Sequence, residues 1–201
     1  MKRCLIAVGT YPQQFAQYFD GDCLFFDTAE SVRHADSESC RAIQLTPGTA
    51  SKPRPDIPAK LLEYSNRDGS AHVECRAYKI VTDTEWFPRL IERFVANASE
   101  VFVFSSSGGG TGNGVCDPLI DDLRSLHPSG RVIFIHAIDP AVNGTKQMQR
   151  IRLIREKGTK DELHLLVRSP ETIRQALSLK RQSLDAIHEI TVNIRTLEVS
   201  I

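Results

Sequence analysis

The residues 105–114, SSSGGGTGNG, constrain the fold of this 201-residue chain more than any other stretch. They follow the apolar run 101–104 and precede leucine and isoleucine residues at helical spacing, so a strand, a glycine loop and a helix are expected in succession. Glycine accepts positive φ and lets another group approach the backbone closely. Free amides at a helix N-terminus attract phosphate. The sequence therefore predicts an anion site at this loop.

A flexible serine and glycine linker is the alternative interpretation of the same stretch. Its flanks argue against a linker, because both are among the most apolar segments of the chain. The loop is not a Walker loop, since no Lys-Ser or Lys-Thr follows the glycines, and it does not read G-x-G-x-x-G. Another kind of glycine-rich phosphate cradle is indicated.

Residues 108–114 read GGGTGNG, which resembles the GGGTGTG or GGGTGSG signature of the tubulin and FtsZ superfamily. Asn113 stands where the family usually has Thr or Ser. The resemblance implies a nucleotide-binding domain that binds GTP or GDP, with Mg²⁺ as a further ligand. It implies phosphate contacts from Ser107, Gly108, Gly109, Gly110, Thr111, Gly112, Asn113 and Gly114.

The rest of the chain alternates strand-like and helix-like segments. Apolar runs typical of strands lie at 5–8, 24–28, 131–138 and 163–167. This alternation predicts an α/β fold with a doubly wound, mainly parallel sheet and helices on both faces. Loops at the carboxyl ends of the strands then lie where open α/β sheets bind ligands.

The middle of the chain has weaker patterns. Residues 46–58 contain four prolines and are expected to form an irregular loop. Residues 73–81 are predicted to form an edge strand. Asp83 or Thr84 is expected to cap the helix that follows, with Pro88 in its first turn.

Two further strand ends resemble the superfamily by position. Gly9 and Thr10 follow the first strand, and the resemblance assigns them phosphate contacts. The cradle there is expected to be weak, because the glycine stands alone and Pro12 lacks an amide donor. Asp27 ends the second strand, where the resemblance makes it an outer-shell residue for Mg²⁺. Capping of a following helix is the alternative role for Asp27.

The nucleoside positions depart from the superfamily. Aligned on the glycine that opens the next helix, the ribose-binding glutamate becomes Asn143 and the nearby arginine becomes Gln147. The base-reading asparagine falls at Ser169 or at the following proline, beside Glu171. Each lost hydrogen bond to a charged group removes roughly 1.5–3 kcal/mol. Guanosine nucleotides are therefore expected to bind with reduced affinity or altered base preference.

The end of the chain is expected to form one long helix over residues 171–197, because its apolar residues recur at spacings of three and four. The expected domains are a nucleotide-binding α/β domain over 1–170 and a C-terminal helix within 171–201, packed on that domain or extending from it. Its apolar stripe predicts packing on the sheet, self-association or a protein partner. The superfamily's acidic catalytic motif is missing, so no catalytic residue is assigned and GTP hydrolysis is expected to be negligible.

Composition excludes several classes of function. Lys plus Arg equals Asp plus Glu at 25 each, so nothing favours nucleic acid or anionic membranes. The apolar runs are too short to cross a bilayer, and the cysteines are widely spaced without a C-x-x-C pair, which predicts a cytoplasmic protein without a disulfide frame or zinc site. Cys116 is interpreted as a small buried residue rather than a reactive thiol. His136 is interpreted as a satisfied core histidine.

The favoured function is a tubulin/FtsZ-like nucleotide-binding protein that acts through assembly or partner regulation, with weak or no hydrolysis of its own. Two alternatives stay open. One is a small enzyme whose glycine loop clamps a phosphorylated metabolite, and the other is an interaction scaffold with a vestigial pocket.

Overall fold

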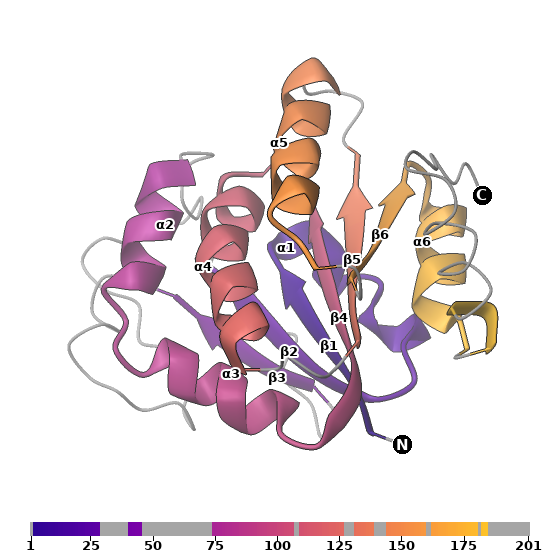
Figure 1. Cartoon of the computed structure of the whole chain (residues 1–201), viewed down its shortest axis with the longest axis horizontal. Coiled ribbons are helices and arrows are strands. Elements are labelled where there is room, and N and C mark those ends of the chain that lie inside the picture. The colour runs from indigo at the N-terminus through magenta and orange to yellow at the C-terminus, as the bar shows by residue number, and fades with distance from the viewer. Residues whose placement is uncertain are drawn as a thin grey trace.

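The computed structural model describes residues 2–28, 40–45, 74–106, 109–126, 131–138, 144–159, 162–180 and 182–184. Six strands of this part of the chain form one sheet, in the order β3-β2-β1-β4-β5-β6, and every neighbouring pair is parallel (Figure 1). The strands are β1 (Lys2–Val8), β2 (Asp22–Asp27), β3 (Cys40–Gln44), β4 (Ala98–Ser106), β5 (Arg131–Ala137) and β6 (Glu162–Val167). The predicted parallel sheet is confirmed.

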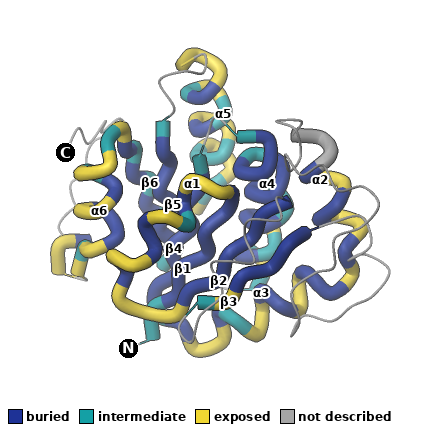
Figure 2. Tube along the Cα trace, turned by 180° about the vertical axis from the view of Figure 1, so that it is seen from behind, coloured by how far each residue is buried: buried dark blue, intermediate teal, exposed yellow. Residues whose placement is uncertain are grey.

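Helices cover both faces of this sheet. They are α1 (Thr10–Gln13), the 3-10 turn η1 (Ala16–Tyr18), α2 (Glu74–Thr82), α3 (Phe87–Val95), α4 (Gly110–Leu126), α5 (Gly144–Glu156) and α6 (Pro170–Ser178). Residues of α2, α3 and α4 share one apolar core with the sheet, and residues around η1 and in α6 share a second core on the opposite face. Figure 2 shows the strands buried between these layers, with exposed residues on the outer sides of the helices.

The strand order reverses between β1 and β4. From β1 the chain winds outward through β2 to β3, then returns to pair β4 with the other side of β1. Beyond β4 it winds in the opposite direction through β5 to β6. The carboxyl ends of β1 and β4 therefore form the topological switch point, which is where ligands bind in such sheets.

The predicted edge strand over residues 73–81 is wrong, because this segment forms helix α2. Its buried side chains are Ala77, Ile80 and Val81, which follow the helical spacing of three and four. Packing of this helical face into the apolar core, with α2 against α4, determines the structure.

Helix α3 has Pro88 in its first turn, as predicted. Neither Asp83 nor Thr84 caps it, because the N-cap residue is Trp86 and no side-chain cap bond forms there. Thr84 instead donates its hydroxyl to a main-chain carbonyl of α2, at 2.6 Å. The buried hydroxyl is thus satisfied at the end of the preceding helix.

The predicted helix over residues 171–197 is interrupted. Helix α6 ends at Ser178, and Leu179 has extended backbone with ψ 129°. The side chain of Leu184 is fully buried in the same core as α6, so this part of the apolar stripe packs back on the sheet. The rest of the predicted helix and the loop over residues 46–58 lie outside the described residues.

Strand β3 was not predicted from the sequence. Only the last three of its five residues are buried, so the apolar signal is short. Among the helices of the described segments, none has both the length and the apolar character needed to span a membrane.

Candidate phosphate-binding site

The glycine loop ends in the first turn of α4, next to the end of β4. The first helical bond of α4 runs from the Asn113 amide to the Gly109 carbonyl, at 3.1 Å. The amides of Gly110 and Gly112 therefore precede the hydrogen-bond ladder. Because α4 is 17 residues long and begins at Gly110, these amides lie at the positive end of a full helix dipole. Ser107 and Gly108 are outside the described residues.

Gly112 has the closest backbone packing in this turn. A Cβ atom on this residue would lie 2.5 Å from the Ser106 carbonyl oxygen, a distance that real Cβ atoms do not tolerate. Only glycine lets the first turn of α4 pack against the end of β4 in this way. The loop is thus held close to the sheet by backbone contact.

The loop after β1 meets this turn from the other side of the switch point. Gly9 has φ 95°, a left-handed conformation that favours glycine, and its amide donates to the Phe26 carbonyl at 2.8 Å. A Cβ on Gly9 would lie 3.8 Å from the Gly112 amide nitrogen. The two predicted phosphate loops therefore approach each other backbone to backbone.

Asp27 connects the β1 loop to the end of β2. Asp27 is 2 % exposed, and its carboxylate accepts hydrogen bonds from the Thr10 hydroxyl at 2.6 Å, the Gln13 side-chain amide at 3.4 Å and the Thr28 main-chain amide at 2.7 Å. The Thr28 hydroxyl is hydrogen-bonded to that of Thr111 in α4, at 2.8 Å. The structure thus brings the ends of β1 and β2 together with the start of α4.

A cleft of about 320 Å³ lies at the same edge of the sheet. Its lining residues come from α1, the ends of β4, β5 and β6, and α6: Tyr11, Ser106, Ala137, Ile138, Val167, Arg168 and Ile173. The volume is at the lower end of small-molecule sites. Sequence reasoning missed Tyr11 and Arg168, although Arg168 directly follows β6 and Tyr11 lies three residues after the end of β1, so both could have been found by that position.

The predicted nucleoside residues do not converge on this cleft. Gln147 is 2 % exposed and Glu171 lies on the surface in the first turn of α6. The Ser169 hydroxyl caps α6 by accepting from the Thr172 amide at 3.2 Å. None of these three lines the cleft among the described residues, and Asn143 lies outside them.

The surroundings of Cys116 and His136, two titratable residues near the site, agree with the structural roles predicted for them. Burial raises the pKa of the Cys116 thiol to about 11, as expected for an unreactive cysteine. His136 is buried and hydrogen-bonded to His164 at 3.0 Å, which satisfies it within the core. Within the described segments, no group of three or more His, Cys, Asp or Glu residues is arranged to hold a metal.

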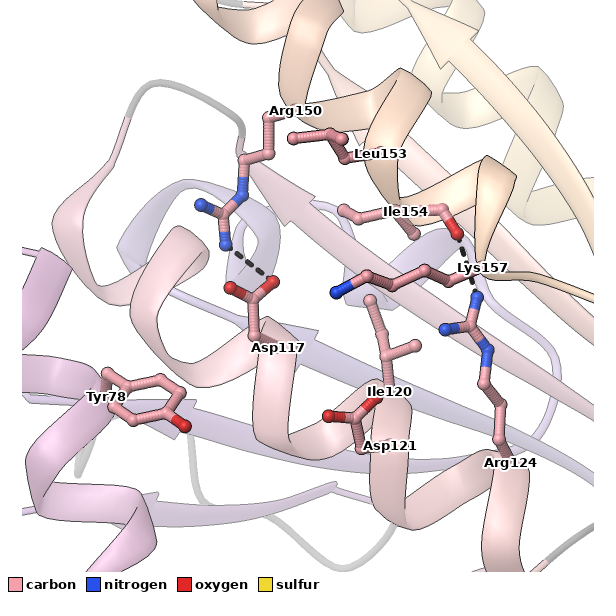
Figure 3. A pocket seen from close by; sticks show the side chains of 9 residues that line it. All are labelled: Tyr78, Asp117, Ile120, Asp121, Arg124, Arg150, Leu153, Ile154 and Lys157. Carbon is pink, nitrogen blue, oxygen red and sulfur yellow. Dashed lines mark hydrogen bonds and ion pairs between the residues drawn. The ribbon is translucent and has the colours of Figure 1, made fainter.

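A second cavity lies away from the strand ends, between α2, α4 and α5 (Figure 3). Its volume is about 270 Å³. Arg150 lies on one wall and donates to Asp117 at 2.8 Å, while Arg124 donates to the Ile154 carbonyl at 2.9 Å. No predicted site residue lines it in the described structure, so it is distinct from the phosphate site.

No protein-family model and no curated protein matches the sequence. Solved structures do match. TubZ of Clostridium botulinum phage c-st, with its C-terminal tail truncated, has a TM-score of 0.60 at 13 % identity, covering 95 % of this chain and 61 % of TubZ. A protofilament of Bacillus thuringiensis serovar israelensis TubZ in its GTPγS form gives 0.54 at 14 % identity, covering 94 % and 55 %. The W319Y mutant of M. jannaschii FtsZ gives 0.52 at 10 % identity, covering 96 % and 54 %.

These similarities show that the chain has the tubulin/FtsZ fold over about 95 % of its length. The resemblance expected from GGGTGNG is confirmed at the level of the fold. The chain spans 54–61 % of the length of these three structures.

Proposed function

We propose that this protein binds a guanosine nucleotide, GTP or GDP, with its phosphates on the first turn of α4 and the loop of Gly9 and Thr10. The observation that carries the proposal is the tight packing of Gly112 on Ser106, which sets the leading amides of α4 at the switch point of the sheet. A glycine loop at a helix N-terminus stabilises phosphate through amides and the helix dipole. Gly114 is buried in the same helix, one turn further on.

The ribose and base occupy the cleft at the ends of β4, β5 and β6 in this proposal. Ser106 lines the cleft and also contacts the glycine turn, so the two regions adjoin. Tyr11 offers an aromatic ring and Arg168 a guanidinium group to a nucleoside. Asn143, Gln147, Ser169 and Glu171 remain predictions for this role, and the Ser169 hydroxyl already serves as a helix cap.

Mg²⁺ fits the oxygen-rich end of β2. Asp27, Thr28 and Thr111 supply oxygen donors of the kind that Mg²⁺ and its waters prefer. Gln44 donates to the Thr28 carbonyl at 3.4 Å, while no residue in the described part of the chain donates to its own buried Oε1. A water of the ion's hydration shell would supply the missing donor, with Asp27 and Gln44 as outer-shell residues.

The mode of action that we favour is assembly or partner regulation with little hydrolysis. One similar structure is itself a TubZ protofilament in a GTPγS form, which supports self-association for this chain. The superfamily's acidic water-activating motif is not recognisable among these 201 residues, so none of them is assigned to positioning water for attack.

Mass spectrometry of the ligand retained through purification, combined with a phosphate-release assay, tests this function. We expect a guanosine nucleotide and release of phosphate close to the buffer blank. A phosphorylated metabolite without a purine would favour a small enzyme instead. An anion-free site together with no binding of added nucleotide would favour a scaffold, and rapid release lost in Gly112→Ala would contradict the absence of hydrolysis.

A further inference from the structure

Two cysteines face each other across strands β2 and β3, at the end of the sheet remote from the glycine loop. Cys23 and Cys40 are direct register partners, so their side chains project from the same face. Cys23 is buried in the core shared with α6, and Cys40 is partly buried and packs against that core. The sequence spacing of these residues did not suggest a pair, because only the parallel register brings them together.

The strand geometry permits a bond between them. Neighbouring strands lie about 4.7–4.9 Å apart, which is within the Cα separation of roughly 4.4–6.8 Å found for disulfides. Cys40 is the first residue of β3, and β3 is an edge of the described sheet, so a small shift of this strand can bring the sulfur atoms together. Because the two cysteines are in-register neighbours, the disulfide torsions have little freedom to reach unstrained values. A strained disulfide is readily reduced.

The two thiols differ in accessibility. Cys40 is partly exposed, whereas Cys23 is 3 % exposed and burial raises its pKa. Cys4 and Cys116 lie in the other core, on the opposite face of the sheet, and burial raises the pKa of each to about 11. Among the cysteines whose side chains are described, Cys40 is thus the one that a small oxidant reaches, and Cys23 is its immediate neighbour.

We propose that Cys23 and Cys40 are a redox modification site that forms a reversible cross-strand disulfide with a hydroperoxide as oxidant. The Cys40 sulfur attacks the peroxide, forming an S–O bond while the O–O bond breaks and, with hydrogen peroxide, water leaves. The Cys23 sulfur then attacks the Cys40 sulfenic acid, forming the S–S bond as the S–O bond breaks. The departing hydroxide takes the Cys23 proton and leaves as a second water, so the two thiols lose two electrons to the peroxide.

This disulfide would fasten the edge strand to its neighbour. At the other end of the same pair, the Leu45 amide donates to the Asp27 carbonyl at 2.7 Å, and Gln44 contacts Thr28. Oxidation would therefore limit separation of β3 from the strand that carries Asp27. The inference rests on the cysteine register alone and does not depend on nucleotide binding.

Graded hydrogen peroxide, followed by thiol blocking, digestion and mass spectrometry of the full chain, tests the proposal. We expect a peptide pair joined through Cys23 and Cys40 that thiol reductant releases, and a rise of a few degrees in Tm on oxidation. In Cys23→Ser the Cys40 sulfenic acid should persist and be trapped by dimedone. A Cys4→Ser/Cys116→Ser variant, the matched control, should retain the cross-link.

Other results would overturn the inference. Oxidation of wild-type Cys40 to sulfinic acid with Cys23 still free would show that the second step does not occur. A cross-link to Cys75 in place of Cys23 would also contradict the proposed pair. No oxidation of Cys40 at peroxide concentrations that modify free cysteine would contradict the first step. Circular dichroism of each serine variant shows whether it is folded, and the wild-type cross-link does not depend on any variant.

Discussion

At the residue scale, Gly112 is the position where the glycine loop is least replaceable. The GGGTGNG pattern predicted a tight loop, but the sequence could not show which glycine is restricted by a neighbour. The restriction comes from the Ser106 carbonyl, 2.5 Å from the position of an added Cβ. Gly144, at the start of α5, has nothing within 4 Å of the same position.

Gly112→Ala is expected to lower the free energy of unfolding by about 1–3 kcal/mol, because the methyl group must displace backbone. Gly144→Ala is the matched control and should change it by less than about 1 kcal/mol in either direction. Urea unfolding of the two variants measures both values. Equal midpoints for Gly112→Ala and wild type would show that the turn relaxes without strain.

The hydroxyl pair of Thr28 and Thr111 joins β2 to α4, at 2.8 Å. Thr28→Val and Thr111→Val should each lower the free energy of unfolding by about 1–3 kcal/mol, since each leaves a buried polar group without this partner. The loss of unfolding free energy in the double variant should be smaller than the sum of the two single losses by about 0.5–1.5 kcal/mol. Strictly additive losses in a double-mutant cycle would contradict a direct interaction.

At the element scale, β5, β6 and α4 are joined by a chain of buried polar groups. His136 contacts His164 at 3.0 Å, His164 lies 3.5 Å from the Glu162 carboxylate, and Arg124 donates to Glu162 at 2.8 Å and 2.9 Å. Burial lowers the pKa of both histidines, and neighbouring positive charge adds to this effect at His136. Burial opposes ionisation of Glu162, but hydrogen bonds from Arg124 and His164 lower its pKa to about 2.

These shifts predict loss of stability in acid. Because the histidine pKa values are lower in the folded state, the unfolded chain binds protons first as the pH falls below about 6.5. The free energy of unfolding should therefore decrease between pH 7 and pH 5, by up to about 1.4 kcal/mol per pH unit for each histidine. A constant or rising value across this interval, measured by urea unfolding, would contradict the buried neutral pair. His164→Gln should make the dependence shallower.

Arg150 holds α5 against α4 at the wall of the cavity in Figure 3. Its guanidinium donates to Asp117 and to the Asn113 carbonyl, and its side chain is 19 % exposed. Arg150→Ala should lower the free energy of unfolding by about 1–2 kcal/mol, allowing for the partial exposure of Asp117. The control is Arg152→Ala, whose ion pair is largely exposed and should contribute less than about 0.5 kcal/mol. Equal effects of the two substitutions in thermal unfolding would contradict this role.

The sequence predicted the elements with long apolar signals and missed those with short or mixed ones. Strands β1, β4 and β5 contain continuous buried runs, which only a covered parallel sheet provides. Residues 73–81 were predicted to form a strand, although the helical face of α2 that carries Ala77, Ile80 and Val81 is buried in the core and α2 packs against α4. Propensity over so few residues does not outweigh tertiary packing.

At the scale of the whole molecule, the parallel arrangement brings all strand-end loops to one edge of the sheet. The sequence could predict this convergence, since each candidate residue follows an apolar run. It could not predict the cleft that Tyr11, Arg168 and Ile173 form, because this depends on how α1 and α6 pack across the sheet. It also could not show that the Ser169 hydroxyl is used as a helix cap.

Isothermal titration calorimetry with GTP, GDP and ATP tests most directly whether the glycine turn binds nucleotide phosphates. We expect saturable heat with a guanosine nucleotide, retained in Gly144→Ala and lost in Gly112→Ala protein that circular dichroism shows to be folded. No heat from any of the three nucleotides at high micromolar wild-type protein would contradict the proposal, as would undiminished binding by Gly112→Ala.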